Sequence, residues 1–347
     1  MNSDYDYNGE VCLARDYSNN GIICKYLQIE VSNLKIEDMS FDLPKEPVDE
    51  ENWDLEKWRK ENPMDYFKAL YILNMDNNSE VKAEVFKAIY KVTRLHIPDI
   101  LYKYYSLSDD EMLNTKKLQT LNNGKIYMSN IEDFNDPFDG KGFFYDPTQL
   151  ADIERLKPHG GKFIDNFNSF IKATSLTKNG VQSMPMWAHY GSNHTGFCVS
   201  YDMKVNIALS SCTLPVQYTH DRLDITRLMR EQAQKVFDEI DHQSTIGKKE
   251  IVLNDLSIIF VSSLLCNIKH TSWNYEQEFR CTTGAIAKGM PFIEAKPKEI
   301  FIGMNCDPFH AKRLLEIAGS WNIPVYKMKF DECSETYALV AKEYIQK

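Results

Sequence analysis

The chain has 347 residues, of which 43% are hydrophobic and 26% charged, and its formal net charge is −10. These proportions are ordinary for a soluble globular protein, and the acidic excess argues against broad, non-specific binding to nucleic acid, while leaving room for a local basic groove. No apolar run approaches the roughly 20 residues that a membrane helix needs, and the polar start at Met1 is not typical of a signal peptide. The eight cysteines form no CxxC pair, so we expect a cytoplasmic protein with reduced thiols and no membrane contact.

The length suits two domains, or one large domain with an appendage. A strand is predicted at residues 22–31, an acidic linker with two prolines at 37–53, and short helices up to about Leu95. We therefore expect a small mixed or mainly helical module at residues 1–98, which carries no chemical motif, and a second domain at residues 99–347.

In the second domain, short strands alternate with helices of unequal length. Strands are predicted at 100–105, 125–129, 172–176, 196–201, 214–218, 272–280, 299–303 and 323–330. Helices are predicted at about 109–121, 162–171, 222–241, 250–269 and 307–319. Gly124 suits a left-handed helix end, and Asp307-Pro308 suits a helix start. This irregular alternation favours an α+β fold over a doubly wound sheet.

The stretch Ser272–Arg280 combines aromatic and charged residues at a spacing of two. If it is a strand, Trp273, Tyr275 and Phe279 point one way, and Asn274, Glu276, Glu278 and Arg280 point the other way. Two carboxylates on one buried strand face are costly unless they are paired or used. A solvated face on which Arg280 neutralises one carboxylate is the structural alternative.

The motifs of P-loop proteins, dinucleotide folds, zinc proteases and serine hydrolases are all missing from the sequence. Oxygen ligands for a metal are nevertheless present, so a metal-dependent nuclease or hydrolase is an alternative. That reading requires convergence of Glu132, Asp136, Asp139, Glu276 and Glu278, which the sequence does not show.

Several short segments, taken in order, resemble a bacterial family named only as a domain of unknown function. They are Lys103–Ser106, Tyr127–Ser129, Asn135–Phe138, Met186–Tyr190, Gly196–Tyr201 and Trp273–Arg280. The hallmarks of that family are an NDPFE-like loop, a WxxY segment and a YExEFR strand. The resemblance covers about residues 100 to 305, and Asp139 stands where the family loop has glutamate.

The order of these segments is also similar, more weakly, to that of the ADP-ribosyltransferases. That likeness implies an ADP-ribosyltransferase-like α+β fold with a split β-sheet, whose cleft binds NAD as a substrate and needs no metal ion. Those enzymes usually have arginine or histidine on the first strand, where this chain has Lys103-Tyr104-Tyr105. The activity implied is transfer of ADP-ribose, a glycosyltransferase reaction.

The resemblance to ADP-ribosyltransferases also implies roles for particular residues. Glu278 would stabilise the cation that forms on the ribose, and Glu276 would take the proton of the acceptor. The residues expected to contact NAD are Tyr104, Tyr105 and Tyr127 by stacking, Ser129 by orienting the acid, and Lys103 or Arg280 at the pyrophosphate.

The acceptor implied by this likeness is RNA or protein, as in bacterial toxins and phage-defence effectors. An antitoxin or other regulatory protein is the expected partner. An RNA acceptor requires a local basic surface, for which the candidates are Lys116, Lys117, Arg222, Arg227 and Arg230. Besides the ADP-ribosyltransferase and the metal-dependent nuclease or hydrolase, a non-catalytic regulatory binding domain is a third possible function.

Overall fold

The computed structural model of the chain describes residues 54, 57, 61, 96–163, 167–247, 262–284 and 291–345. Most of the expected module at residues 1–98 lies outside these ranges, so its predicted elements stay predictions. Within it, Asp54 Oδ1 accepts a hydrogen bond from the backbone N–H of Lys57 at 3.1 Å, as expected for a helix cap. None of the helices in the described ranges has the length and apolar character that crossing a membrane requires.

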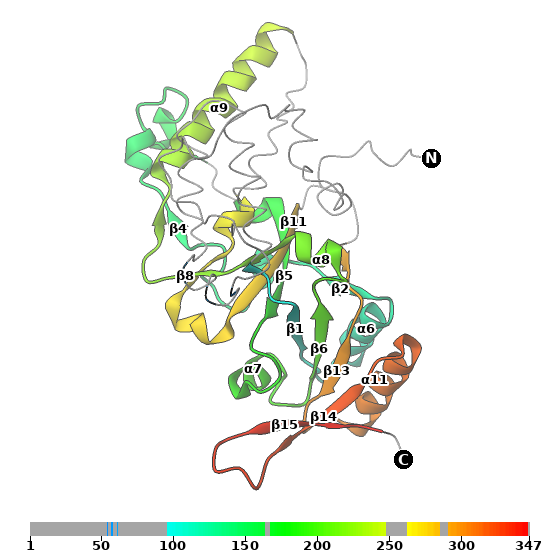
Figure 1. The fold of residues 1–347 in the computed structure, drawn as a ribbon. Helices are drawn as coiled ribbons and strands as arrows, with labels where there is room; N and C mark the ends of the chain where they lie inside the picture. The colour runs from blue at the N-terminus through cyan, green and yellow to red at the C-terminus, as the bar shows by residue number, and fades with distance from the viewer. Residues whose placement is uncertain are drawn as a thin grey trace.

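A nine-stranded sheet forms the centre of the described part of the chain (Figure 1). Its order is β15-β14-β13-β6-β1-β5-β11-β7, and β3 also pairs with β5. β13 and β14 are parallel, and the other neighbouring strands are antiparallel. The strands are β1 (Ile100–Tyr105), β3 (Ser129–Asn130), β5 (Ile171–Thr177), β6 (Phe197–Asp202), β7 (Thr213–Pro215), β11 (Glu278–Gly284), β13 (Glu299–Ile302), β14 (Val325–Phe330) and β15 (Leu339–Glu343).

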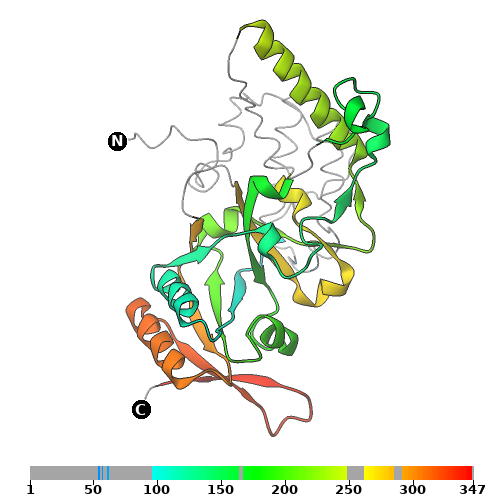
Figure 2. The ribbon, with the colours of Figure 1, turned by 180° about the vertical axis from the view of Figure 1, so that it is seen from behind.

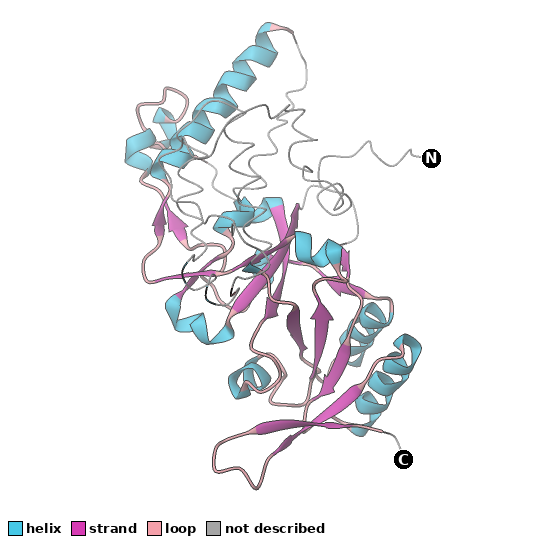
Figure 3. Ribbon diagram, viewed as in Figure 1, coloured by secondary structure: helices cyan, strands magenta, loops and turns pink. Residues whose placement is uncertain are grey.

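Three two-stranded sheets and several helices complete the described structure (Figure 3). The small sheets pair β10 (Ile268–His270) with β8 (Gln217–Thr219), β12 (Phe292–Glu294) with β2 (Lys125–Tyr127), and β4 (Phe143–Phe144) with β9 (Leu223–Asp224). The α-helices are α6 (Glu111–Asn122), α7 (Met184–His189), α8 (Ile207–Ser211), α9 (Thr226–Thr245) and α11 (Pro308–Trp321). Short 3₁₀ helices span Ile131–Asp133, Pro147–Leu150, Lys157–His159, Phe167–Phe170 and Thr271–Glu276. The expected α+β class is confirmed.

The main core lies between the sheet and the helices α6 and α11, which run side by side on one of its faces (Figures 1 and 2). Leu118 of α6 and Leu314 of α11 are buried there against strand residues such as Val199 and Ile300. A second cluster surrounds the buried Trp187 of α7. Both clusters contain residues of β1 and β6, so these central strands are fixed by packing on both faces.

The ends of α6 and α11 follow the chemistry that the sequence predicts. Asp110 Oδ1 accepts from Leu113 N–H at 3.0 Å, and Gly124 follows the helix at a φ of +64°. Asp307 caps α11 through the N–H of Phe309 at 2.7 Å, with Pro308 in the first turn.

The sheet parts between the neighbouring strands β1 and β5. Along one edge β5 pairs with β11 over residues 171–177. Along the other edge of β5, β3 pairs with residues 172 and 173, and β1 pairs only with Thr177. Within the described part of the chain, no strand pairs with residues 174–176 on that edge. The gap that this leaves is the location of the candidate site.

Three predicted elements are wrong. Residues 272–280 do not form one strand, because a 3₁₀ helix occupies Thr271–Glu276, Gln277 has a φ of 46°, and β11 begins at Glu278. The helix predicted at 162–171 is replaced, where the structure describes it, by the 3₁₀ helix Phe167–Phe170 and the start of β5. The helix predicted at 250–269 is helical at residues 262–265, but its end is β10, and residues 248–261 lie outside the described ranges.

The strand predicted at 125–129 is divided. β2 pairs with β12 in a small sheet, whereas β3, only one residue further on, joins the large sheet beside β5. The hydrophobic pattern is continuous across this point, so it does not reveal the change of partner.

Candidate functional site

A cavity of about 90 Å³ opens where β1 and β5 part. β1 contributes Tyr102, Lys103 and Tyr104 to its wall, and β5 contributes Ser175, Leu176 and Thr177. The remaining lining residues are Phe134, Asn135, Met186, Tyr190, Lys269, Glu276 and Glu278. Segments far apart in the sequence therefore meet at the split in the sheet.

Glu276 and Glu278 both line this cavity, as their spacing predicts, but a different backbone places them there. Glu276 ends the 3₁₀ helix, and Glu278 begins β11 opposite Thr177 of β5. The left-handed conformation of Gln277 turns the chain between them. Thr177 Oγ1 donates to the backbone oxygen of Glu276 at 2.6 Å, which ties this turn to β5.

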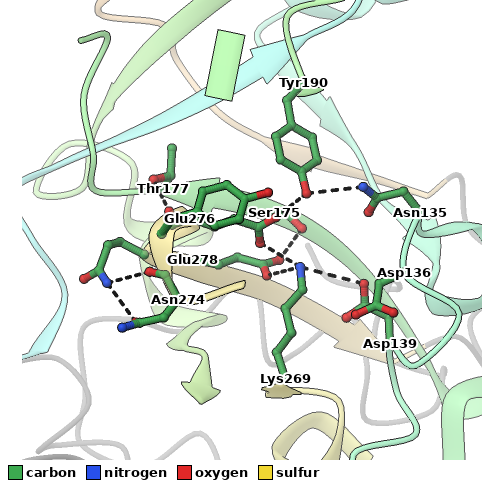
Figure 4. A network of polar contacts seen from close by, with 12 residues as sticks. Asn135, Asp136, Asp139, Ser175, Thr177, Tyr190, Lys269, Asn274, Glu276 and Glu278 are labelled. Atoms are coloured by element: carbon green, nitrogen blue, oxygen red, sulfur yellow. Dashed lines mark hydrogen bonds and ion pairs between the residues drawn. The ribbon is translucent and has the colours of Figure 1, made fainter. Parts of the chain in front are cut away.

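Lys269 of β10 joins the two carboxylates (Figure 4). Its Nζ lies 2.6 Å from Glu276 Oε2 and 3.2 Å from Glu278 Oε2, and 4.0 Å from Asp139 Oδ2. The ammonium also lies 4.8 Å from the centre of the Trp273 ring. A single buried cation thus holds both acids at one site.

Arg280 holds Glu278 from the other side. Its Nε donates to Glu278 Oε1 at 2.8 Å, its Nη2 donates to Glu278 Oε2 at 3.1 Å, and the same Nη2 donates to Asp139. Ser175 Oγ adds a hydrogen bond to Glu278 Oε1 at 2.5 Å. Arg280 is fully buried and Glu278 is 5% exposed, so this is a desolvated, charge-assisted pair rather than a solvated sheet face.

The two glutamates differ in proton affinity although they are neighbours. Burial alone would raise the pKa of Glu278, but Arg280 and then Lys269 outweigh it and lower that pKa to about 2. Burial, followed by the negative charge of Glu278, raises the pKa of Glu276. One carboxylate is therefore held ionised, and the other is biased toward accepting a proton.

Lys103 provides a second cation in the wall of the cavity. Its Nζ donates to the carbonyl oxygen of Ser175 at 3.3 Å across the gap between β1 and β5. Burial lowers its pKa to about 8. Its ammonium also lies 5.4 Å from the centre of the Tyr105 ring.

The other residues expected to contact NAD do not all reach the cavity. Tyr104 lines it, with its hydroxyl donating to Gly180 O at 2.6 Å. Tyr105 points to the opposite face of β1 and stacks on Phe197, with ring centres 4.7 Å apart. Tyr105 is not among the residues that line the cavity, although its ring centre lies 5.4 Å from the Lys103 ammonium, and its contact with NAD stays a prediction.

Tyr127 and Ser129 do not line this cavity either, and their expected roles in binding NAD stay predictions. Tyr127 is 50% exposed on β2 and packs against Phe292. Ser129 lies opposite Ala173 on β5 and is not among the residues that line the cavity. Ser175, two residues further along β5, makes the hydrogen bond to the acid that was expected of Ser129.

The contact of Arg280 with the pyrophosphate stays a prediction, and in the structure its guanidinium pairs with the carboxylates of Glu278 and Asp139. Lys269 was missed as a site residue, because the apolar pattern before it predicts a helix and nothing in the spacing links it to Glu276. A lysine shortly before a pair of acids is the only signal in the sequence that points to it.

The carboxylates proposed as metal ligands do not converge as that alternative requires. Glu132 is exposed, and Asp136 Oδ1 accepts from the N–H of Phe138 at 2.9 Å in a turn. Asp139 does reach the two glutamates, but Lys269 and Arg280 lie between the carboxylates. Among the described residues, no group of three or more histidine, cysteine, aspartate or glutamate side chains is arranged to hold a metal ion.

Residues 186–281 match a family described as a protein of unknown function, DUF2971. The matched segment contains Tyr190, Lys269, Glu276, Glu278 and Arg280, which make up much of the site. No curated protein and no solved structure matches the chain.

Proposed function

We propose that this protein is an NAD-dependent ADP-ribosyltransferase, and that the split between β1 and β5 is its NAD site. The observation that carries the proposal is the pair of cavity glutamates with pKa values moved in opposite directions. Two carboxyl groups separated in this way are the usual arrangement for an acid–base role and a charge-stabilising role in one site. Enzymes that break glycosidic bonds use such carboxyl pairs.

In the proposed reaction the bond between ribose C1′ and nicotinamide breaks, and its electron pair leaves with neutral nicotinamide. Positive charge then develops on the ribose. Glu278 stays ionised at neutral pH because Arg280 and Lys269 hold it so, and a fixed negative charge in a dry cavity stabilises that cation.

Glu276 is the proposed proton acceptor. An oxygen or nitrogen atom of the acceptor forms the new bond to C1′, and its proton passes to Glu276. Because its pKa is raised, Glu276 binds a proton more readily than an ordinary glutamate, as a general base at neutral pH requires.

The cavity walls supply groups for the rest of the substrate. The ammonium of Lys103 suits a phosphate oxygen, and Tyr102 and Tyr104 offer rings to a planar base. The cavity holds only a small group, so we expect the ribose and nicotinamide to enter it while the adenosine half lies at its mouth.

The acceptor is proposed to be RNA or protein, as for a toxin or phage-defence effector with a regulatory partner. Four of the five basic residues considered for RNA binding already bond to other groups: Lys117 to Ser106, Arg222 to Phe143 O, Arg227 to Glu231 and Arg230 to Asp152. These basic residues therefore give no support to an RNA acceptor.

Incubation of the purified protein with labelled NAD and cell lysate tests both the reaction and the acceptor. The proposal predicts label in a macromolecular fraction together with free nicotinamide. Removal of the label by RNase identifies an RNA acceptor, and removal by protease identifies a protein acceptor. Label in neither fraction, with no nicotinamide released, would sink the proposal.

A further inference from the structure

Tyr190 links the loop at residues 134–139 to Glu276. The phenol hydroxyl of Tyr190 donates to Glu276 Oε1, and Asn135 Nδ2 donates to the Tyr190 oxygen at 3.3 Å (Figure 4). These residues come from the end of α7, from the 3₁₀ helix before β11 and from the loop after β3. We propose that Tyr190 is a positioning residue for Glu276, and that Asn135 holds Tyr190 in place.

The two oxygens of Glu276 have separate partners. Lys269 Nζ contacts Oε2 at 2.6 Å, and the Tyr190 hydroxyl contacts Oε1. With one donor on each oxygen, rotation of the carboxylate is restricted, and Tyr190 provides the half of this restraint that faces the 134–139 loop. Without it, Lys269 alone would leave the carboxylate free to turn about its Cγ–Cδ bond.

Tyr190 is suited to donating a proton in a hydrogen bond and not to losing it. Burial, and then its hydrogen bond to the negatively charged Glu276, raises the pKa of the phenol. The phenol therefore stays protonated at neutral pH, so Tyr190 is the donor in this hydrogen bond.

The same loop reaches Glu278 by a second route. Asp139 pairs with Arg280, and Arg280 pairs with Glu278. The ring of Phe134 lies 5.2 Å from the Arg280 guanidinium. One loop thus restrains both glutamates, each through an intermediate side chain, which gives a physical reason for the compact Asn-Asp-Pro-Phe-Asp sequence.

Loss of the Tyr190 hydroxyl has a defined effect on Glu276. The charged and titratable groups that face this carboxylate are Lys269, Glu278, Tyr190, Tyr218 and Tyr275. Among them, Lys269 and Tyr190 favour the ionised form, and Glu278 opposes it. Removing the Tyr190 hydrogen bond therefore raises the pKa of Glu276 further.

The test compares Tyr190→Phe with Tyr201→Phe. Tyr201→Phe is the matched control because it removes a tyrosine hydroxyl from a partly buried hydrogen bond, to Tyr105 at 3.0 Å, on the other side of β1. Protein labelled with ¹³C at the glutamate carboxyl groups is titrated by NMR without any substrate. The resonance that Glu276→Gln removes identifies Glu276.

We expect the Glu276 titration to move to higher pH in Tyr190→Phe and to stay in place in Tyr201→Phe. In Asn135→Ala, a change at an exposed residue, the Glu276 titration should also move to higher pH, but by less. This variant provides the test if Tyr190→Phe does not fold. An unchanged Glu276 titration in folded Tyr190→Phe and Asn135→Ala would overturn the proposal.

A second part of the test measures activity and rests on the proposed function. Transfer to the acceptor should fall about tenfold or more in Tyr190→Phe, the effect of losing a hydrogen bond to a charged group, and the pH profile of transfer should shift upward. Nicotinamide release should fall less, because the role of Glu276 is confined to the acceptor. If the wild-type protein releases no nicotinamide, the proposed function fails, but the substrate-free titration still decides the role of Tyr190.

Discussion

Glu276 and Glu278 line one cavity, but the cations around them are shared unequally. Glu278 receives both Arg280 and Lys269, whereas Glu276 has Lys269 and the neutral Tyr190. Each residue that could neutralise these acids is itself buried. The two positions should therefore respond in opposite ways to the loss of a charge.

We predict that Glu278→Gln destabilises the protein at neutral pH by about 3 kcal/mol, since it removes one partner from a buried ion pair and leaves Arg280 with Asp139 alone. Glu276→Gln should be neutral or stabilising, because an amide resembles the protonated form that burial favours at this position. Urea unfolding of both variants at neutral pH measures the difference. Equal losses in the two variants would contradict the assignment of the pKa shifts.

The same difference predicts a pH dependence. The pKa of Glu278 falls from 4.5 to about 2 on folding, so the folded state binds fewer protons than the unfolded state between these values. Stability should therefore decrease as pH falls from about 4.5 to 2, with about 3 kcal/mol arising from this one group.

Urea unfolding of the wild type and of Glu278→Gln over that pH range tests this dependence. The variant lacks the titrating group, so its stability should change less with pH than that of the wild type. Parallel curves would show that Glu278 is not the group responsible.

At the scale of the element, the short connection from the 3₁₀ helix to β11 determines where the two acids point. The alternation of aromatic and polar residues over 273–280 favours a strand, and Glu276 and Glu278 do share a site. The pattern fails because β11 has a partner strand only from Glu278 onward. Before that point, the chain is held in the 3₁₀ helix by hydrogen bonds from Ser272 N–H to the His270 ring and from the Gln277 side chain to Asn274 O. A period of two cannot reveal where a partner strand begins.

We predict that Gln277→Val destabilises the protein by about 1–2 kcal/mol, since a β-branched residue is strained at positive φ. Gln277→Gly provides the matched control, as glycine adopts this conformation without strain. Both variants lose the hydrogen bonds from the Gln277 side chain to Asn274, so the difference between them isolates the backbone. Equal stabilities in urea unfolding would argue against a left-handed residue at this position.

At the scale of the whole molecule, regular elements could be predicted from the sequence more successfully than the site. β1, α6 and α11 have clear start and stop signals, and the structure places them within a few residues of the predicted ranges. Lys269 and Ser175 could not be assigned, because their roles depend on which strands become neighbours. The same is true of Tyr105 and Tyr127, which are aromatic like Tyr104 but lie elsewhere.

The division of the chain at about residue 98 stays a prediction. The described part from residue 96 onward contains the large sheet, both core clusters and the candidate site. We expect residues 99–347 to bind NAD alone if the division is correct, with the same affinity as the full chain. Calorimetric titration of both proteins with NAD makes this comparison, and loss of binding by a folded 99–347 fragment would place part of the site in the first 98 residues.

Release of nicotinamide from NAD is the most direct measure of the central claim, that the ionised Glu278 in the split of the sheet stabilises a ribosyl cation. The comparison uses wild type, Glu278→Gln and the control Tyr201→Phe, each shown by circular dichroism to be folded at the assay temperature. We predict release by the wild type and by Tyr201→Phe, and a rate at least about a hundredfold lower for Glu278→Gln. Release at the wild-type rate by folded Glu278→Gln would contradict the claim.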